Sequence, residues 1–403
     1  MPLLFFTVFN SILGLSVLFP ILGPLGRDLG LTETEIGAMS TSYALTQLLF
    51  SASWGRRSEK KGRKQVLLVG VVGFALAFGL LAIVAEIGRT GFVSHAVLFG
   101  LMLAARLVGG AFASAMLPTA QAYAADLTSR ENRASGMAVI GAAFGLAIIF
   151  GPVIGGVLAH FWGLTAPLWF STAFGVLNAI LVWIRLPEPP RRPASMYPPT
   201  TLRDLGRRAW PLLSVAAVAT FATVMMEQTM AFLVQDRLRL SEEDTPVWMA
   251  GALFVYGVVA VIVQGGLVRR VRIAPTMLMM LGMPLTVAGL FTLMQAHTYV
   301  WMVIGMALQG FGQGLALPGI SSAMSLTVTE DEQGAIAGLN NSALGLGRLL
   351  GPLLGTSLYE IHDTLPYGAG AGLISIVLLF VIASPQMRAI AKRHQDVMRS
   401  ASP

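Results

Sequence analysis

The sequence has no cysteine and little charge. Only 12% of its 403 residues are charged, whereas 55% are hydrophobic, and the mean hydropathy is +0.71. The lack of cysteine excludes disulfides, thiolate chemistry and cysteine-ligated metal sites. A soluble domain carries about twice this share of charged residues. We therefore expect lipid to be the solvent for most of the surface.

The chain also lacks the marks of an enzyme. Its five histidines include no two at the spacing of metal ligands. No nucleophile–base set, nucleotide-binding loop or metal cluster is found, and the loops leave no room for a soluble catalytic domain. We expect no enzymatic activity, no metal and no cofactor.

Long apolar runs dominate instead. A bilayer core takes about 20 apolar residues per helical span, and twelve stretches qualify. They are residues 3–23, 35–54, 65–86, 95–124, 134–159, 164–186, 210–235, 246–268, 275–295, 298–327, 334–359 and 366–384. The sequence predicts an all-α membrane protein with twelve transmembrane helices.

Basic residues are distributed unevenly between the loops. Of 27 Lys and Arg, 21 lie in the even-numbered loops and the C-terminal tail, and four lie in the odd-numbered loops. An excess of positive charge marks the cytoplasmic side. We expect a multi-pass protein of the cell membrane (inner or plasma membrane) with both termini in the cytoplasm. The net charge of +7 then has lipid headgroups as its partner, and not nucleic acid.

Two related halves are visible in the sequence. Three segments recur 200 positions later: Gly110 as Gly310, residues 117–118 as 317–318, and residues 151–155 as 351–355. Residues 28–31 likewise correspond to 237–240. Such halves are typical of transporter folds. The predicted domains are a first six-helix bundle, a proline-rich cytoplasmic linker, a second six-helix bundle and a cytoplasmic tail, at 1–186, 187–209, 210–384 and 385–403.

Spans five and eleven combine glycines with a central proline. Glycines at four-residue spacing leave one helix face without side chains, so that a neighbouring backbone can approach closely. A proline removes one backbone donor and bends a helix. The residues concerned are Gly151, Pro152, Gly155, Gly351 and Pro352. Tight packing and a moving hinge are equally compatible with this pattern.

Glu227 is the only acidic residue near the middle of a span. An ionised group at that depth costs at least about 2.5–3.5 kcal/mol, so such residues face the bundle interior and usually function there. Desolvation favours the neutral form of a carboxyl, so Glu227 can load and release a proton. The alternative is a permanently protonated, hydrogen-bonded carboxyl. Arg106 and Arg348 are the cations inside spans. For each of them, a purely structural role is the alternative to a functional one.

Four motifs follow one another along the chain. They are Leu13-Gly14 with Pro20, the loop from Gly55 to Lys64 with Gly62-Arg63-Lys64 (the signature loop), the pair Arg106 and Gly110, and the glycines from Gly145 to Gly156. Together they resemble the motifs of the major facilitator superfamily, specifically its twelve-span drug:proton antiporter branch. The resemblance implies a part in proton coupling for Arg106 and a pairing of Arg63 with Asp126. Glu59 is expected against the start of span eleven, where the helix end is positive. These contacts would latch the cytoplasmic side; the alternative is that the loop charges are solvated and bind headgroups.

Polar side chains within the spans are candidates for a substrate cavity, although most could simply bond helix to helix. They are Asn10, Gln47, Gln121, Tyr123, Gln228, Tyr256, Gln309, Gln313, Asn341 and Arg348. Methionines at 225, 226 and 230 surround Glu227 and would suit varied lipophilic ligands as an adaptable wall.

The pattern favours a monomeric exporter that works by alternating access. A lipophilic or cationic small molecule would leave the cell as a proton enters. A sugar, metabolite or amphipathic lipid on the same fold, without proton coupling, is the alternative. A membrane-embedded enzyme and a receptor without transport are less well supported, because no catalytic set is found and the halves are duplicated.

Overall fold

The computed structural model describes residues 2–128, 133–189, 202–268, 270, 273–329, 332–387 and 390. Regular structure in these ranges is helical throughout, and no strand occurs in them. Most of the expected linker (190–201) and nearly all of the tail after 387 lie outside the described residues. The all-α prediction is confirmed.

The first six predicted spans correspond to eight helices. These are α1 (Pro2–Ser16), α2 (Leu22–Asp28), α3 (Glu33–Lys61), α4 (Arg63–Arg89), α5 (His95–Ala113), α6 (Met116–Leu127), α7 (Arg133–Trp162) and α8 (Ala166–Arg185). The first predicted span is interrupted around Pro20, which cannot donate a backbone hydrogen bond. Helix α1 ends before this proline and α2 begins after it. The fourth breaks at Ser114-Ala115, shortly before Pro118.

The last six predicted spans correspond to six α-helices and one π-helical turn. These are α9 (Leu202–Leu238), α10 (Thr245–Ile262), η1 (Val263–Val268), α11 (Pro275–Gln295), α12 (Tyr299–Ser325), α13 (Gln333–Ile361) and α14 (Leu365–Ala383). Helix α9 begins eight residues before the predicted span. Leu205 and Ala209 of that extra segment are buried in an apolar core, which explains why it is helical.

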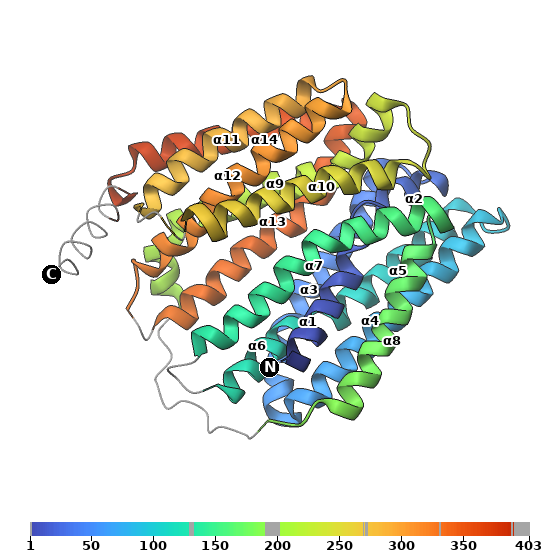
Figure 1. Ribbon diagram of the computed structural model, residues 1–403, viewed down its shortest axis with the longest axis horizontal. Helices are drawn as coiled ribbons and strands as arrows, with labels where there is room; N and C mark the ends of the chain where they lie inside the picture. Colours follow the sequence, from blue (N-terminus) through green and yellow to red (C-terminus); the bar gives the residue numbers. More distant parts are fainter. Residues whose placement is uncertain are drawn as a thin grey trace. The chain divides into compact units, whose positions relative to one another are not determined.

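The chain forms two compact units (Figure 1). The first consists of described residues within 1–195 and 230–254, and the second of those within 196–229 and 255–403. Helices α9 and α10 are therefore each divided between the two units, although each helix is continuous along the chain.

In the first unit, α1 packs against α7 and α8, while α5 packs against α3 and α4. Helix α7 approaches α1 closely because it carries glycines at the contact. A Cβ on Gly151 would collide with Ser16, and a Cβ on Gly155 would collide with the carbonyl oxygen of Val17. Gly141 and Gly145, on the same helix, have open space beside them. Close approach is thus confined to one part of α7.

In the second unit, α11 packs against α12 and α14 (Figure 1). Gly282 lies 2.5 Å, measured from an ideal Cβ, from the carbonyl oxygen of Gly312, so the two backbones touch. Gly347 meets the backbone of α9 in the same way, 2.8 Å from the carbonyl oxygen of Ala217. Helices α7 and α13 run through Pro152 and Pro352 without ending.

Nine helices within the described residues are long and apolar enough to cross a membrane. The twelve predicted spans are consistent with this number, because α1 is short and α3 and α13 carry charge or many polar residues. Large apolar side chains such as Leu76 and Trp183 are 69% and 66% exposed. These outward side chains require lipid around the molecule.

Candidate proton and gating sites

Glu227 lies on α9, half-buried within the second unit. Arg348 of α13 and Tyr256 of α10 are close enough to act on it electrostatically. Two helices, α10 and α13, therefore contribute one polar residue each to the surroundings of this carboxyl. No described residue forms an ion pair within 4.0 Å of Glu227, so its charge is not locked into a contact.

The predicted cavity residues of the second unit fall into two groups. Gln309 donates to the carbonyl oxygen of Thr286 at 2.8 Å, and Gln313 donates to the hydroxyl of Thr223. Both glutamines therefore join α12 to a neighbouring helix. Gln228 and Tyr256 are half-buried, and Asn341 and Arg348 are exposed.

The methionines around Glu227 differ from the expected adaptable wall. Met225, Met226 and Met230 are between 0% and 1% exposed. Met225 fills the space left by Gly355, its Cγ lying 2.6 Å from an ideal Cβ there. These side chains pack helices together instead of facing an open cavity.

Arg106 lies on α5 and is 6% exposed. Its guanidinium stands over the ring of Tyr43 on α3, 4.4 Å from the centroid, and its Nε donates to the carbonyl oxygen of Met39 at 3.4 Å. Among the described residues it has no ion pair. Its charge is balanced by an aromatic face and a carbonyl dipole. The Tyr43 hydroxyl is buried and has no hydrogen-bond partner in the part of the chain that the structure describes.

The other predicted cavity residues of the first unit have different environments. Asn10 is 3% exposed, and its side-chain oxygen has no hydrogen-bond partner among the described residues. Gln47 and Gln121 are half-buried. Tyr123 is 1% exposed and donates to the carbonyl oxygen of Pro187 at 2.6 Å, so it anchors the chain after α8.

One residue of the signature loop, Arg63, forms the ion pair that was predicted for it. Arg63 binds Asp126 at 2.9 Å through Nε, and a second nitrogen donates to the hydroxyl of Ser58 at 2.6 Å. Both charged side chains are 16% exposed. Glu59 is exposed, and its expected position at the start of span eleven stays a prediction.

The sequence reasoning missed Glu188 and Tyr43. Both carboxylate oxygens of Glu188 accept backbone N–H groups, from Arg63 and Lys64 at the start of α4. An acid suits this position because helix N-termini carry partial positive charge. An acid among prolines directly after span six was the available signal. Tyr43 had no such signal, because its partner lies 63 positions away in the chain.

Gly62 makes the Glu188 contact possible. Its φ is +109°, which side chains rarely tolerate, and an ideal Cβ would lie 2.8 Å from the Glu188 carboxylate. Gly55, at the other end of the signature loop, lies inside α3 with open space beside it.

Comparison with known proteins shows the family of this chain. The model of the family described as the Major Facilitator Superfamily matches residues 4–352 and, again, 271–398. Multidrug resistance protein 1 of Bacillus subtilis is 25% identical over 387 residues, 95% of both chains. Quinolone resistance protein NorA of Staphylococcus aureus is 24% identical over 396 residues, 96% of this chain and 97% of that protein.

A solved structure has the same fold. The human organic anion transporter TETRAN superimposes with a TM-score of 0.66 at 21% identity, over 94% of this chain and 98% of that one. The helical order, the duplicated halves and the family match all agree. This chain belongs to the Major Facilitator Superfamily.

Proposed function

We propose that this protein is a multidrug exporter that moves a lipophilic or cationic small molecule out of the cell in exchange for protons. The observation that carries the proposal is a single titratable carboxyl, Glu227, within a span and near Arg348 and Tyr256. Two relatives of nearly equal length bear the names Multidrug resistance protein 1 and Quinolone resistance protein NorA. An enzymatic role has no comparable support.

In this mechanism, Glu227 exchanges a proton for the cargo. The ionised carboxylate attracts a cationic ligand and is itself stabilised by Arg348. Protonation removes that negative charge and leaves Arg348 without its counter-charge. The two protonation states thus favour different arrangements of α9 and α13, which is what coupling requires.

Arg106 has a secondary part in the proposal. Because an arginine stays protonated, it cannot carry the proton. A fixed positive charge held against Tyr43 instead sets the electrostatic potential inside the first unit. Replacing it changes that potential without removing the titrating group.

The proposed mechanism also assigns the gate and the hinge. Arg63, Asp126 and Glu59 form the cytoplasmic latch, supported by Gly62. The glycines and prolines of α7 and α13 keep helices in contact while the two six-helix bundles, 1–186 and 210–384, move. The loop charges orient the protein in the cell membrane with both termini in the cytoplasm, as a monomer surrounded by lipid.

A flux assay tests the function. Wild-type protein in liposomes with an imposed pH gradient is expected to concentrate a lipophilic cationic dye, and Glu227→Gln is expected to abolish gradient-driven accumulation. Binding of a neutral ligand should survive in the variant. Glu243→Gln, an exposed loop carboxyl, is the matched control and should keep full flux.

The outcomes separate the alternatives. Accumulation by Glu227→Gln at the wild-type level removes this residue from coupling. If flux through the wild-type protein does not depend on the pH gradient, the protein is a facilitator with the same fold. Absence of dye flux, with flux of a sugar or lipid instead, would change the cargo and leave the fold assignment intact.

A further inference from the structure

A pocket lies between the loop ends of α3 and α4, inside the first unit. Its volume is about 270 Å³. Sites that enclose a drug-sized molecule are larger, at roughly 300–1,000 Å³. Each helix contributes three residues to the wall, which are Trp54, Arg57 and Lys61 of α3 and Gln65, Val66 and Val69 of α4. The pocket therefore suits a small group, such as the headgroup of a lipid, better than a whole drug molecule.

The two walls change from polar to apolar in the same direction, away from the loop. The α3 series is Lys61, Arg57, Trp54 and Phe50, and the α4 series is Gln65, Val69, Val72 and Leu76. Steps of three or four residues keep each series on one face of its helix. Phe50, Val72 and Leu76, which lie beyond the pocket, are exposed. This gradient matches an amphipathic ligand with its polar end at the loop.

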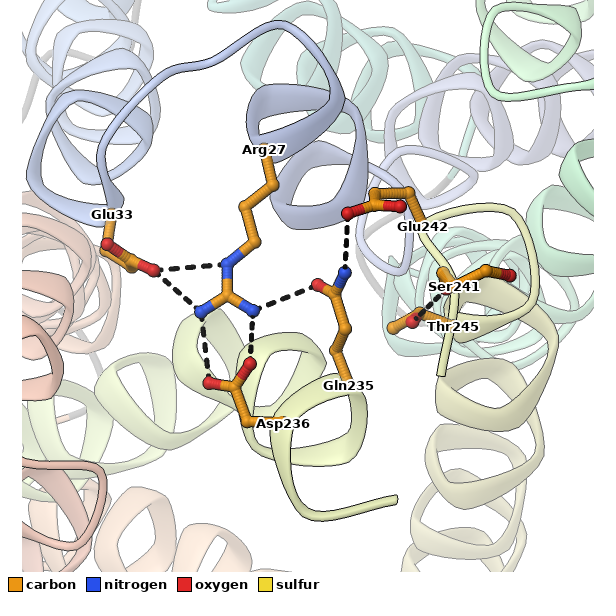
Figure 2. Close-up of polar contacts among 7 residues, drawn as sticks. All are labelled: Arg27, Glu33, Gln235, Asp236, Ser241, Glu242 and Thr245. Atoms are coloured by element: carbon orange, nitrogen blue, oxygen red, sulfur yellow. Dashed lines mark hydrogen bonds and ion pairs between the residues drawn. The ribbon is translucent and has the colours of Figure 1, made fainter. Parts of the chain in front are cut away.

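Arg57 and Lys61 give the pocket its positive charge. Among the described residues, neither side chain has an ion pair. Arg27 shows the contrast, because its guanidinium donates to the carboxylates of Asp236 and Glu33 (Figure 2). Two cations without a counter-charge at one pocket attract an anion.

The acidic side chains of this region do not cancel that charge. Glu59 lies two positions from each of the two cations, which is about 200° around the helix and so on another face. Asp126 binds Arg63 at 2.9 Å. Glu188 accepts the backbone N–H groups at the start of α4. The pocket thus keeps two positive charges.

Trp54 holds Arg57 in a position to bind an anion. The indole N–H donates to the carbonyl oxygen of Ala111 at 2.8 Å, and the indole ring centroid lies 6.2 Å from that of Phe112, so α5 fixes the indole. The Arg57 guanidinium stands over this ring, 5.0 Å from its centroid. Stacking uses the face of the guanidinium and leaves the N–H donors at its edge, whose fork matches two oxygens of a phosphate.

We propose that this pocket binds the phosphate of one anionic phospholipid. Arg57 and Lys61 bind the phosphate oxygens, Gln65 donates to the headgroup, and the exposed apolar series of α3 and α4 contact the acyl chains. A soluble anion would make no use of those apolar side chains. In the proposed orientation, the loop faces the cytoplasmic leaflet, whose anionic lipids attract basic residues. The lipid stabilises this end of the first unit and takes no part in the exchange of cargo.

Quenching of tryptophan fluorescence tests the site. Wild-type protein in detergent micelles is titrated with phosphatidylglycerol whose acyl chains carry bromine, which quenches nearby indoles. The quenching is expected to saturate. Trp54→Phe should remove the saturable part, although the other six of the seven tryptophans remain. Saturable quenching that survives Trp54→Phe in full overturns the proposal.

Two double variants with the same loss of charge separate a site from general attraction. Arg57→Gln with Lys61→Gln should weaken the apparent affinity for brominated phosphatidylglycerol at least about tenfold, because it removes charge-assisted hydrogen bonds. Arg56→Gln with Lys60→Gln is the matched control, since both side chains are exposed and neither lines the pocket. The control should weaken binding much less, because charges outside the pocket act through water. Equal weakening by both pairs overturns the proposal.

Thermal unfolding gives a second readout of the same site. A ligand that binds only the folded state stabilises it, so phosphatidylglycerol should raise the melting temperature of the wild type and of the Arg56/Lys60 control. It should leave the Arg57/Lys61 variant nearly unchanged. The melting temperatures without lipid show that both variants fold.

Two further ligands identify the chemistry that the pocket recognises. Phosphatidylcholine with the same chains should raise the melting temperature less, because its choline cancels the phosphate charge. An equal rise overturns selection for an anionic lipid. Inorganic phosphate should displace the brominated lipid no better than chloride at equal ionic strength. Stronger displacement by phosphate would make a soluble anion the ligand and overturn the proposal.

Discussion

At the scale of single residues, the two glycines of the signature loop have opposite constraints. Gly62 holds a backbone angle that side chains rarely adopt and lies against the carboxylate of Glu188, whereas Gly55 lies in a helix with open space beside it. The same substitution at the two positions is therefore expected to have effects of opposite sign.

Gly62→Ala should lower the free energy of unfolding by about 1–2 kcal/mol, because a Cβ is strained at positive φ and would displace Glu188. Gly55→Ala should raise it by up to about 1 kcal/mol, since alanine is the better helix former. Thermal unfolding of the purified proteins in detergent measures both. Equal destabilisation by the two variants would contradict this account of the loop.

The Arg63–Asp126 pair allows a double-mutant cycle. Arg63→Gln and Asp126→Asn should each reduce flux, because each leaves a charged partner that is only 16% exposed without its counter-charge. The double variant should be no worse than either single variant. Lys61→Gln, an exposed cation of the same loop, should have little effect. Additive losses in the double variant would argue against direct coupling.

At the scale of helices, α7 is tightly packed along one part of its length and has open space beside another part. Gly151 and Gly155 face the break between α1 and α2, while the space beside Gly141 is empty. Gly151→Leu should abolish flux and destabilise the fold, since the side chain would collide with Ser16. Gly141→Leu should be tolerated. Flux and thermal stability of the two variants check the prediction; a normal Gly151→Leu protein would contradict it.

Helix α3 begins with a capping box that predicts a pH dependence. The side chain of Thr32 accepts from the Glu35 backbone, and the Glu35 carboxylate accepts from the Thr32 backbone. Burial raises the pKa of Glu35, but the hydrogen bonds from Thr32 and the contact with His95 outweigh it and hold the pKa below the ordinary value of 4.5. The carboxylate is thus favoured in the folded state.

A group with a lowered folded-state pKa stabilises the protein above its unfolded pKa, and this contribution is lost as the pH falls through the folded value. Thr32→Ala should cost about 1 kcal/mol at neutral pH. Glu35→Gln should lower the thermal midpoint at pH 7, and its difference from the wild type should shrink below pH 4.5. A difference that grows in acid would reverse the sign and contradict the argument.

At the scale of the whole molecule, the charge of the loops orients the chain. If the positive loops face the cytoplasm, Lys60→Cys should react with an impermeant thiol reagent only in inverted vesicles. Thr90→Cys should react only in right-side-out cells. Both positions are exposed, and the chain offers no background thiol. The opposite labelling pattern would invert the proposed topology and place the Arg63–Asp126 pair outside the cell.

Much of this architecture follows from the sequence alone. A segment of about 20 apolar residues in lipid must satisfy its backbone hydrogen bonds internally, so each predicted span is expected to be helical. The predicted spans are helical apart from short stretches, chiefly the breaks at residues 17–21 and 114–115. The repeat at residues 151–155 and 351–355 revealed the duplication, and Glu227 stood out because no other acid lies deep in a span. Arg63 and Asp126 meet as their motifs implied.

Only the tertiary structure decided which side chains meet across the chain. Glu188 reaches Arg63 over 125 positions and Arg27 reaches Asp236 over 209, and neither distance leaves a periodic trace in the sequence. Such pairs depend on how far each helix is rotated and shifted against its neighbours. That fit is set by collective packing, which a single segment does not encode. For the same reason, the sequence did not show that Tyr123 donates to the carbonyl oxygen of Pro187 or that Gln309 donates to that of Thr286.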